Sequence, residues 1–597
     1  SLFVNTDTSA RDNLVAGIAI ALCTIFLSIK YFPGVESSHY YAGFIMRAID
    51  GTLLSKDPIV GDAIGSTTPY KLTAYYLLPK LFGTLWLDDR FVLPFYLLSV
   101  AASFYLADRI AVALGAGHIL IRLTVLLLFM RDHQVLENHI NFAHQPDFHH
   151  SAMAMPLSLL VLYMAIARKP LWLVLGSGLI LAAVTLQVAP STLGFALLAT
   201  LFVGTKNEKC IAGTLLLVGI AVFIWGMANV VHVAENERVE LWHRLTSDWY
   251  DGMARPFEPH YGGVLRVVII NSLFAGIMLG AIFWPAAGGK RNAVIALRII
   301  VAVACVLWLT LGGFVQLAPP SVQYPQILLF PVTRQLQSAQ VIAMIGLAVF
   351  ALNWAFNAPD IRKTLVASLV ILLLVVAGPG NHTLWAGLFV LSGVTAAGLF
   401  WAYSQKAPAA NNGHDVRRNP ISAIFLTTLL TMTVAIGYAI HDRGSDWAQL
   451  FRTGTHGSSA AAKWQNIAPY LAQNTPRDSV VLPLEWVEGA SPPRLVVRRN
   501  VASRSGRAVP FPMRLNQGLD LTWFDFTDAQ YALLDKIKEG WLTGNAEQIN
   551  AAVKGLNPRP SYIIVPEVLA DQPGPALARE ILTTIDGFTI LKLAETP

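Results

Sequence analysis

The chain has 597 residues, of which 54% are hydrophobic and 13% are charged, and its formal net charge is +6. With a mean hydropathy of +0.52, this composition excludes a water-soluble globular protein and predicts a polytopic membrane protein. Several stretches offer about 18 or more residues with almost no charge, which is enough for a helix to cross roughly 30 Å of hydrocarbon. We therefore expect membrane helices and not barrel strands.

Apolar stretches rich in Leu, Ile, Val and Ala predict about thirteen membrane-spanning helices. The third, sixth and eleventh are shorter than about 17 residues, so they need flanking residues or a re-entrant path. The first follows a short polar segment and lacks a small-residue cleavage site, which predicts a retained anchor. The predicted spans are residues 13–29, 91–114, 119–130, 151–166, 171–188, 193–203, 211–231, 265–285, 294–314, 341–356, 365–377, 383–403 and 421–440.

The distribution of Lys and Arg predicts the orientation, because cytoplasmic loops collect these residues. If the N-terminus is cytoplasmic, the longer outer loops are 32–90, 131–150, 232–264 and 316–340, and everything after residue 440 is also outside. The net charge then reflects topology, and it predicts no nucleic-acid partner. The loops on the inner side carry Arg168 and Lys169, Lys206 and Lys209, Lys290 and Arg291, Arg362 and Lys363, and Lys406, Arg417 and Arg418.

Composition also predicts two domains, a membrane domain over residues 1–440, with a long first outer loop at 32–90, and a soluble domain over 441–597. The second has ordinary soluble composition and is long enough to fold by itself. It alternates helix and strand patterns, which favours an α/β fold. The three cysteines lie in or beside apolar spans, so no disulfide framework is expected. The patterns cover residues 460–473, 479–484, 495–497, 529–539, 546–556, 562–566, 574–584 and 589–593.

The first outer loop carries the candidate catalytic carboxylates, Glu36, Asp57 and Asp62. Glu36 lies directly outside the first span, close to His39 and Tyr40. A partly desolvated carboxylate at the membrane boundary can act as a general base toward a hydroxyl acceptor. The alternative is an interfacial loop with a solvated Glu and a belt of aromatic residues.

The second outer loop holds five of the 14 histidines within residues 131–150. Imidazole and carboxylate groups are suitable ligands for Zn, Mn or Fe. The candidate ligands for a divalent metal ion are His144, Asp147, His149 and His150. No HExxH motif selects a geometry, so the alternative is that these histidines bond to backbone, to phosphate or to one another.

Two later outer loops carry the candidate phosphate-binding residues, Arg244 and His260 in one and Arg334 in the other. Arginine matches phosphate oxygens because its guanidinium can donate two parallel hydrogen bonds. A lipid-linked phosphate donor would need such a contact. The alternative is solvated loop charge, with arginine contacting ordinary lipid headgroups.

The overall layout resembles the GT-C superfamily of polytopic glycosyltransferases. A long acidic outer loop follows the first span, and a second outer loop leads through residues 151–156 into the fourth helix. The tail is similar to the outer domain of bacterial members over residues 464–468, 474–482 and 494–511. The resemblance implies a membrane domain followed by a periplasmic domain in a bacterial inner membrane.

The resemblance further implies transfer of a sugar from a polyprenyl-phosphate carrier to a glycan, lipid or protein acceptor on the periplasmic face, usually with inversion. Glu36 matches the acidic position of the family. The expected acidic pair after the first span is missing, so either Glu36 works alone or Asp57 and Asp62 return toward it. The adjacent pair Asp88 and Asp89 lies at the far end of the loop.

Two other functions stay open. A non-catalytic scaffold subunit of a membrane complex would also retain the layout and lose the acidic pair. A transporter would show internal repeats and ionisable residues at mid-membrane depth. We find no such repeat, and Arg122 and Arg298 lie near the inner ends of their spans, where they can reach the interface.

Overall fold

The structure, a computed structural model, forms two compact units that we describe separately. The larger unit contains Ser1–Tyr31, Phe95–Gln145 and His150–Gly444, and the smaller contains Phe32–Pro94, Pro146–His149 and Ser445–Pro597. The smaller unit therefore groups the first outer loop with the C-terminal residues. The structure describes residues 10–29, 37–61, 73–130, 148, 152–230, 234–246, 264–286, 288–323, 332–357, 361–376, 447–448, 450–452, 466–484, 505–510, 521–567 and 578–593.

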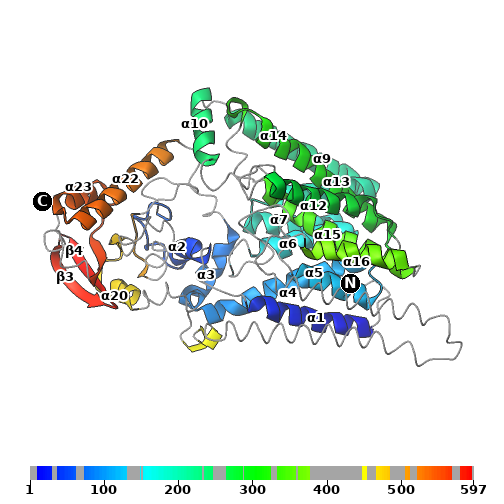
Figure 1. Cartoon of the computed structure of the whole chain (residues 1–597), viewed down its shortest axis with the longest axis horizontal. Coiled ribbons are helices and arrows are strands. Elements are labelled where there is room, and N and C mark those ends of the chain that lie inside the picture. Colours follow the sequence, from blue (N-terminus) through cyan, green and yellow to red (C-terminus); the bar gives the residue numbers. More distant parts are fainter. Residues whose placement is uncertain are drawn as a thin grey trace. The chain divides into compact units, whose positions relative to one another are not determined.

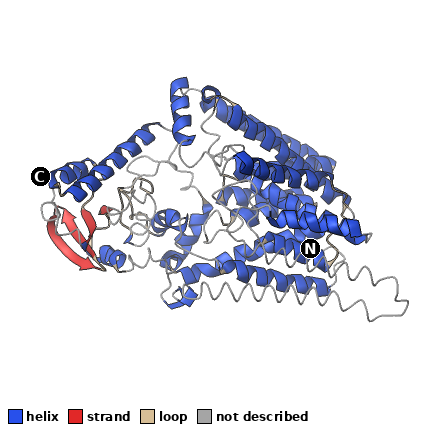
Figure 2. Cartoon of the chain, in the orientation of Figure 1, coloured by secondary structure: helices blue, strands red, loops and turns tan. Residues whose placement is uncertain are grey.

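Helices form the described part of the larger unit (Figure 2). Their bounds follow the apolar stretches. Helix α8, for example, has Pro190 in its first turn, a position where proline is favoured. The helices are α1 (Ala10–Ser28), α4 (Asp89–Ala113), α5 (Ile119–Phe129), α6 (Ala154–Ile166), α7 (Leu171–Val184), α8 (Ala189–Val203), α9 (Lys206–Val230), α10 (Glu235–Thr246), α12 (Val264–Phe283), α13 (Arg291–Leu307), the π-helical turn η4 (Trp308–Gly312), α14 (Gly313–Leu317), η5 (Pro320–Val322), α15 (Val332–Asn357) and α16 (Ile361–Val376).

The chain is mostly helical, and five segments of the described helices are long and apolar enough to cross a membrane. Five further apolar helices are shorter. The prediction of a helical membrane protein is thus confirmed at this level. The predicted spans at 383–403 and 421–440 lie outside the described residues. The five longer segments are Ala10–Ser28, Asp89–Ala113, Lys206–Trp225, Arg291–Leu317 and Arg334–Phe356.

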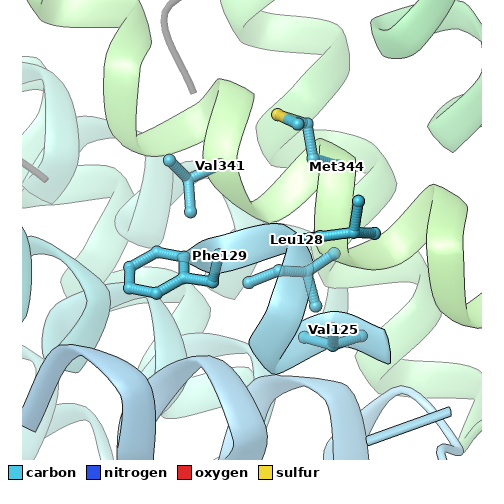
Figure 3. Close-up of a pocket in the computed structure, with 6 residues that line it drawn as sticks. Val125, Leu128, Phe129, Val341 and Met344 are labelled. Carbon is cyan, nitrogen blue, oxygen red and sulfur yellow. The ribbon is translucent and has the colours of Figure 1, made fainter. Parts of the chain in front are cut away.

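Helix α15 is the most buried of these spans, with 83% of its apolar window inside the protein. It packs against α5, α8, α12, α13 and α16. Small residues allow this, because a Cβ on Gly346 would lie 2.8 Å from Leu297. Where α5 meets α15, an apolar cavity of about 10 Å³ is lined by Phe129, Val341 and their neighbours (Figure 3). It is too small and too apolar to hold a polar ligand.

A buried ion cluster joins three helices of the larger unit. Asp108 on α4 accepts two 2.7 Å hydrogen bonds from Arg122 on α5, and both side chains are 1% exposed. Arg109 donates a further 2.7 Å bond to Asp108, and Asn13 on α1 accepts from Arg122 at 3.1 Å. The sequence suggested that Arg122 can reach the membrane interface. In the structure, Arg122 is instead buried and paired with Asp108. A carboxylate one turn inside the neighbouring helix holds it.

The first outer loop folds into short helices within the smaller unit: α2 (Ser37–Ile49), η2 (Ala74–Tyr76), α3 (Leu77–Phe82) and η3 (Gly83–Leu87). Phe44, Leu54, Ile59 and Val60 form a small apolar core. Next to it, the Tyr75 hydroxyl donates to the Phe148 carbonyl at 2.9 Å, and the Trp86 ring lies edge-to-face with Tyr75 and tilted to Phe148. Phe148, from the histidine-rich loop, is thereby fixed against the first loop.

The C-terminal part of the smaller unit is a four-stranded sheet in the order β1-β2-β4-β3 with helices beside it (Figure 1). β1 and β2 are parallel, and the other two pairings are antiparallel. Asp586 and Gly587 both have positive φ and close the β3–β4 hairpin. The elements are α20 (Ile467–Asn474), β1 (Val481–Pro483), α22 (Leu521–Thr543), α23 (Ala546–Gly555), β2 (Tyr562–Pro566), β3 (Ala578–Ile585) and β4 (Phe588–Leu593).

Arg507 fixes the end of α20 in this unit. Its guanidinium is nearly fully buried and donates to the carbonyls of Ala472 and Thr475 at 2.8 and 2.7 Å. It also donates to the Thr475 hydroxyl at 2.9 Å. Carbonyls at a helix C-terminus lack helical partners, and a cation is favourable there. The next residue, Ala508, forms a parallel bridge with Val480, directly before β1, so Arg507 joins the helix to the sheet edge.

We expect Arg507→Met to lower the local opening free energy of this unit by about 3 kcal/mol, because it leaves several buried carbonyls without a donor. Arg507→Lys should lose less. Hydrogen exchange of the buried amides of β2 in the full chain measures the change. The control is Arg477→Met, which removes a guanidinium that is 71% exposed. Equal effects of the two Met variants would contradict this role.

Two exposed ion pairs connect the first loop to the C-terminal residues of the same unit. Lys56 donates to Asp478 at 2.8 Å, and Arg477 donates to Asp50 at 3.1 Å. The hydrogen bond and the charge of Lys56 lower the pKa of Asp478. Bonds from Thr52, and then the charge of Arg477, lower the pKa of Asp50.

These shifts predict a stabilisation that depends on pH. Since the folded pKa of Asp478 is below its ordinary value of about 3.9, the stabilisation is present above that value and is lost as pH falls through the folded pKa. Asp478→Asn should cost less than about 1 kcal/mol at pH 7, because the pair is exposed. The difference in stability between Asp478→Asn and wild type should vanish at acidic pH. Asp535→Asn on α22 is the control, and a difference that persists at pH 2 would contradict the prediction.

Candidate functional site

Arg334, a predicted phosphate-binding residue, lies in the first turn of α15 and is 6% exposed. Its Nη1 donates to the side-chain oxygen of Gln187 at 2.6 Å. Gln335 donates to the Gln187 carbonyl at 2.7 Å and accepts from Ser191 at 2.6 Å. The turn before α8 therefore holds the guanidinium at the start of α15.

The first two turns of α15 carry buried polar side chains, whereas the buried side chains in the middle of the helix are apolar. Arg334, Gln335, Gln337, Ser338 and Gln340 are each at most 9% exposed. Buried polar side chains are costly unless they are hydrogen-bonded, and the contacts with Gln187 and α8 meet part of this need. An apolar sequence would have packed here at lower cost. The polar stretch therefore indicates a function beyond packing.

The electrostatics of this cluster favour an anion. The N-termini of α8 and α15 both lie in the cluster, and each carries a partial positive charge. Arg334 adds a full positive charge in the first turn of α15, where a cation is unfavourable for the helix itself. The hydrogen bond to Gln187 orients the guanidinium. Backbone N–H groups at helix N-termini and arginine are both suited to phosphate oxygens.

The segment that follows α14 is held in place close to η5. Gln323 is fully buried, and its amide nitrogen donates to the carbonyls of Phe314, Val315 and Ala318 at 2.9 to 3.2 Å. This closes the C-terminal end of α14. Helix α10 packs against η5. Arg244 on α10 pairs with Glu240 at 2.8 Å and is partly exposed, so the structure places it on a helix surface. His260 lies outside the described residues.

Of the predicted catalytic carboxylates, the structure describes Asp57. It is fully buried in the smaller unit, and its Oδ1 accepts from the backbone amides of Ile59 and Val60, both at 3.0 Å. These bonds form the turn that leads to Gly61, a position where a Cβ would lie 2.2 Å from the Ser55 carbonyl. Asp57 thus stabilises a tight turn. Glu36 and Asp62 lie outside the described residues.

The predicted metal ligands His144, Asp147, His149 and His150 also lie outside the described residues. Within the described ranges, no group of three His, Cys, Asp or Glu side chains is close enough to hold a metal ion. The metal site therefore stays a prediction. The described residue between two of these ligands, Phe148, packs against Tyr75 and Trp86.

The sequence did not single out two neutral members of this cluster, Gln187 and Ser191. Gln187 stood inside a predicted span at 171–188, but α7 ends at Val184. The signal was present, because Gln187 precedes the sequence Ala189-Pro190-Ser191, which is typical of a helix start. The polar run from Arg334 to Gln340 was likewise visible as an interruption before an apolar span.

The chain matches no protein-family model and no curated protein sequence.

The contact between Gln187 and Arg334 makes a stability prediction. Gln187→Ala should lower the stability of the detergent-solubilised chain by about 1–3 kcal/mol, because a buried guanidinium N–H loses its acceptor. Gln187→Glu should restore the acceptor and bring the melting temperature back to the wild-type value or above. Asn207→Ala on α9, an exposed amide, is the control. Equal melting temperatures for the Ala and Glu variants would contradict the contact.

Proposed function

We propose that this protein is a membrane glycosyltransferase of the GT-C type, which moves a sugar from a polyprenyl-phosphate donor to an acceptor at the periplasmic face of a bacterial inner membrane. The observation that carries the proposal is the buried Arg334 at the N-terminus of α15, held by Gln187. A phosphate diester at a membrane boundary is an anion of the kind that this cluster would stabilise.

The proposed reaction requires the protein mainly to position the donor and the acceptor. The bond between the anomeric carbon of the sugar and a phosphate oxygen breaks, and a bond from that carbon to the acceptor oxygen forms. Polyprenyl phosphate leaves with the electron pair, and the acceptor proton passes to a carboxylate. Arg334 would stabilise the negative charge that develops on the leaving phosphate. Holding donor and acceptor in line supplies much of the remaining acceleration.

Glu36 is the proposed general base, since it matches the acidic position of the family that the chain resembles. Asp57 and Asp62 were the other candidates. Two backbone amides in a tight turn donate hydrogen bonds to the buried Asp57 carboxylate. This arrangement favours a structural role for Asp57. Arg244 and His260 remain proposed as secondary donor contacts, and the metal ligands of the second outer loop as a support for that loop.

The length of α15 supports a membrane-spanning arrangement with this cluster at one face. Arg334 begins the helix, and Asn353 near its other end donates to the Gly115 carbonyl at 3.0 Å. The 19 residues between them span about 28 Å at 1.5 Å per residue, close to the thickness of a bilayer core. The proposed architecture has about thirteen spans, a cytoplasmic N-terminus and a periplasmic C-terminal domain.

Turnover assays with a polyprenyl-phosphate sugar test the proposal. Membranes containing the full chain are supplied with labelled donor, and the release of polyprenyl phosphate and the labelled product are both measured. Glu36→Gln should lower turnover at least 100-fold through loss of the base. Arg334→Ala should lower it by a similar factor, whereas Arg334→Lys should retain part of the donor affinity because the charge remains.

The matched controls are Glu547→Gln on α23 and Arg452→Ala, both at exposed positions, and both should turn over like wild type. Melting temperatures identify variants that merely unfold. A well-folded wild type that releases no polyprenyl phosphate from any sugar donor would favour the scaffold subunit instead. Wild-type turnover in both Glu36→Gln and Arg334→Ala would refute the residue assignments.

A further inference from the structure

A polar cavity lies in the larger unit, near the end of α15 opposite to Arg334. Its volume is about 520 Å³, which is within the usual range for small-molecule sites. Of the twelve described residues that line it, five are Lys or Arg and none is Asp or Glu. The cations are Arg109, Arg168, Lys169, Lys290 and Arg291.

These cations come from segments that are far apart in the sequence. Arg109 is on α4, Arg168 and Lys169 follow α6, and Lys290 and Arg291 begin α13. A close backbone approach fixes α13 beside α4: a Cβ on Gly289 would lie 2.5 Å from the Leu114 carbonyl, and one on Gly115 would lie 2.7 Å from Gly288. The cavity is therefore built by the packing of the helices and not by one charged loop.

Arg168 is held in a conformation that favours glycine. Its φ is +57°, and it occupies the turn that ends α6, where Lys169 donates its backbone N–H to the Met164 carbonyl at 2.8 Å. Glycine is the usual residue at such a position, and a residue with a Cβ costs about 1–2 kcal/mol there. Backbone strain of this kind is concentrated at functional sites, such as ligand-binding sites.

Two carboxylates contact cations of the cavity. Asp108 contacts Arg109 at 2.7 Å but is shared with the buried Arg122. Glu208 reaches Arg168 at 4.0 Å. Five cations around one cavity repel one another, and this Coulomb repulsion is larger beside an apolar bundle than in water. A bound anion would relieve that repulsion.

The geometry points to a phosphate-binding site in this cavity, for an anionic phosphate group supplied either by a membrane phospholipid headgroup or by a soluble diphosphate. Several cations from different helices can surround phosphate oxygens from more than one side. Basic pockets between membrane helices on the cytoplasmic side are suited to anionic headgroups. The site is independent of the proposed transferase, since about 28 Å of α15 separates its end of the bundle from Arg334.

Binding to the purified full chain tests this site. Phosphatidylglycerol and phosphatidylcholine are compared by native mass spectrometry, and inorganic pyrophosphate by calorimetry and by competition with the lipid. Wild type should prefer phosphatidylglycerol over phosphatidylcholine, or bind pyrophosphate, with competition by pyrophosphate indicating the soluble source. The double variant Lys169→Gln/Arg291→Gln should weaken this binding at least tenfold.

Arg168→Gly separates binding from folding. Glycine relieves the backbone strain, so the melting temperature should be retained or raised, while anion binding falls severalfold. Lys206→Gln, an exposed lysine that does not line the cavity, should bind like wild type. The site is refuted if the Lys169→Gln/Arg291→Gln variant binds phosphatidylglycerol and pyrophosphate as wild type does. It is also refuted if wild type shows neither headgroup preference nor pyrophosphate binding.

Discussion

A charged side chain inside an apolar helix bundle must have partners, and the larger unit is organised around that requirement. Asp108 and Arg122 are each 1% exposed and share two 2.7 Å hydrogen bonds. Removing either partner of such a pair typically costs about 3–5 kcal/mol, because the other charge stays buried. With Asn13, the pair holds α1, α4 and α5 in one relative arrangement. The α4–α5 turn then meets α13 and α15 through Gly115.

That arrangement gives α15 two chemically different ends. At its start, Arg334 lies among neutral amides and hydroxyls near the beginning of α8. At its other end, Asn353 contacts the turn beside which the cations of α4 and α13 gather. The apolar middle packs against α5 beside a cavity of about 10 Å³. Polar chemistry is thus confined to the two ends, as expected for a segment that crosses a bilayer core.

Periodicity and composition predicted the helices and strands more accurately than they predicted the contacts between side chains. The helical membrane class, the strand near residues 479–484 and the helices near 529–539 and 546–556 follow from local pattern, and the structure has β1, α22 and α23 at these places. The end of α7 was misplaced by four residues, because an apolar run does not show where a turn begins. Arg334 was a candidate from its charge and loop position, but Gln187 was not, since the predicted span at 171–188 placed this neutral amide within a helix.

By itself, the sequence determined that the chain is mostly helical, with segments apolar enough to cross a membrane, because hydropathy and length limit the possible solutions. It also marked Arg168, Lys169, Lys290 and Arg291 as inner-loop charges. Only the tertiary structure decided that they line one cavity, that Asp57 supports a turn and that Asp108 holds Arg122. Those outcomes depend on contacts between residues distant in the chain, and such contacts arise from packing and not from any local pattern.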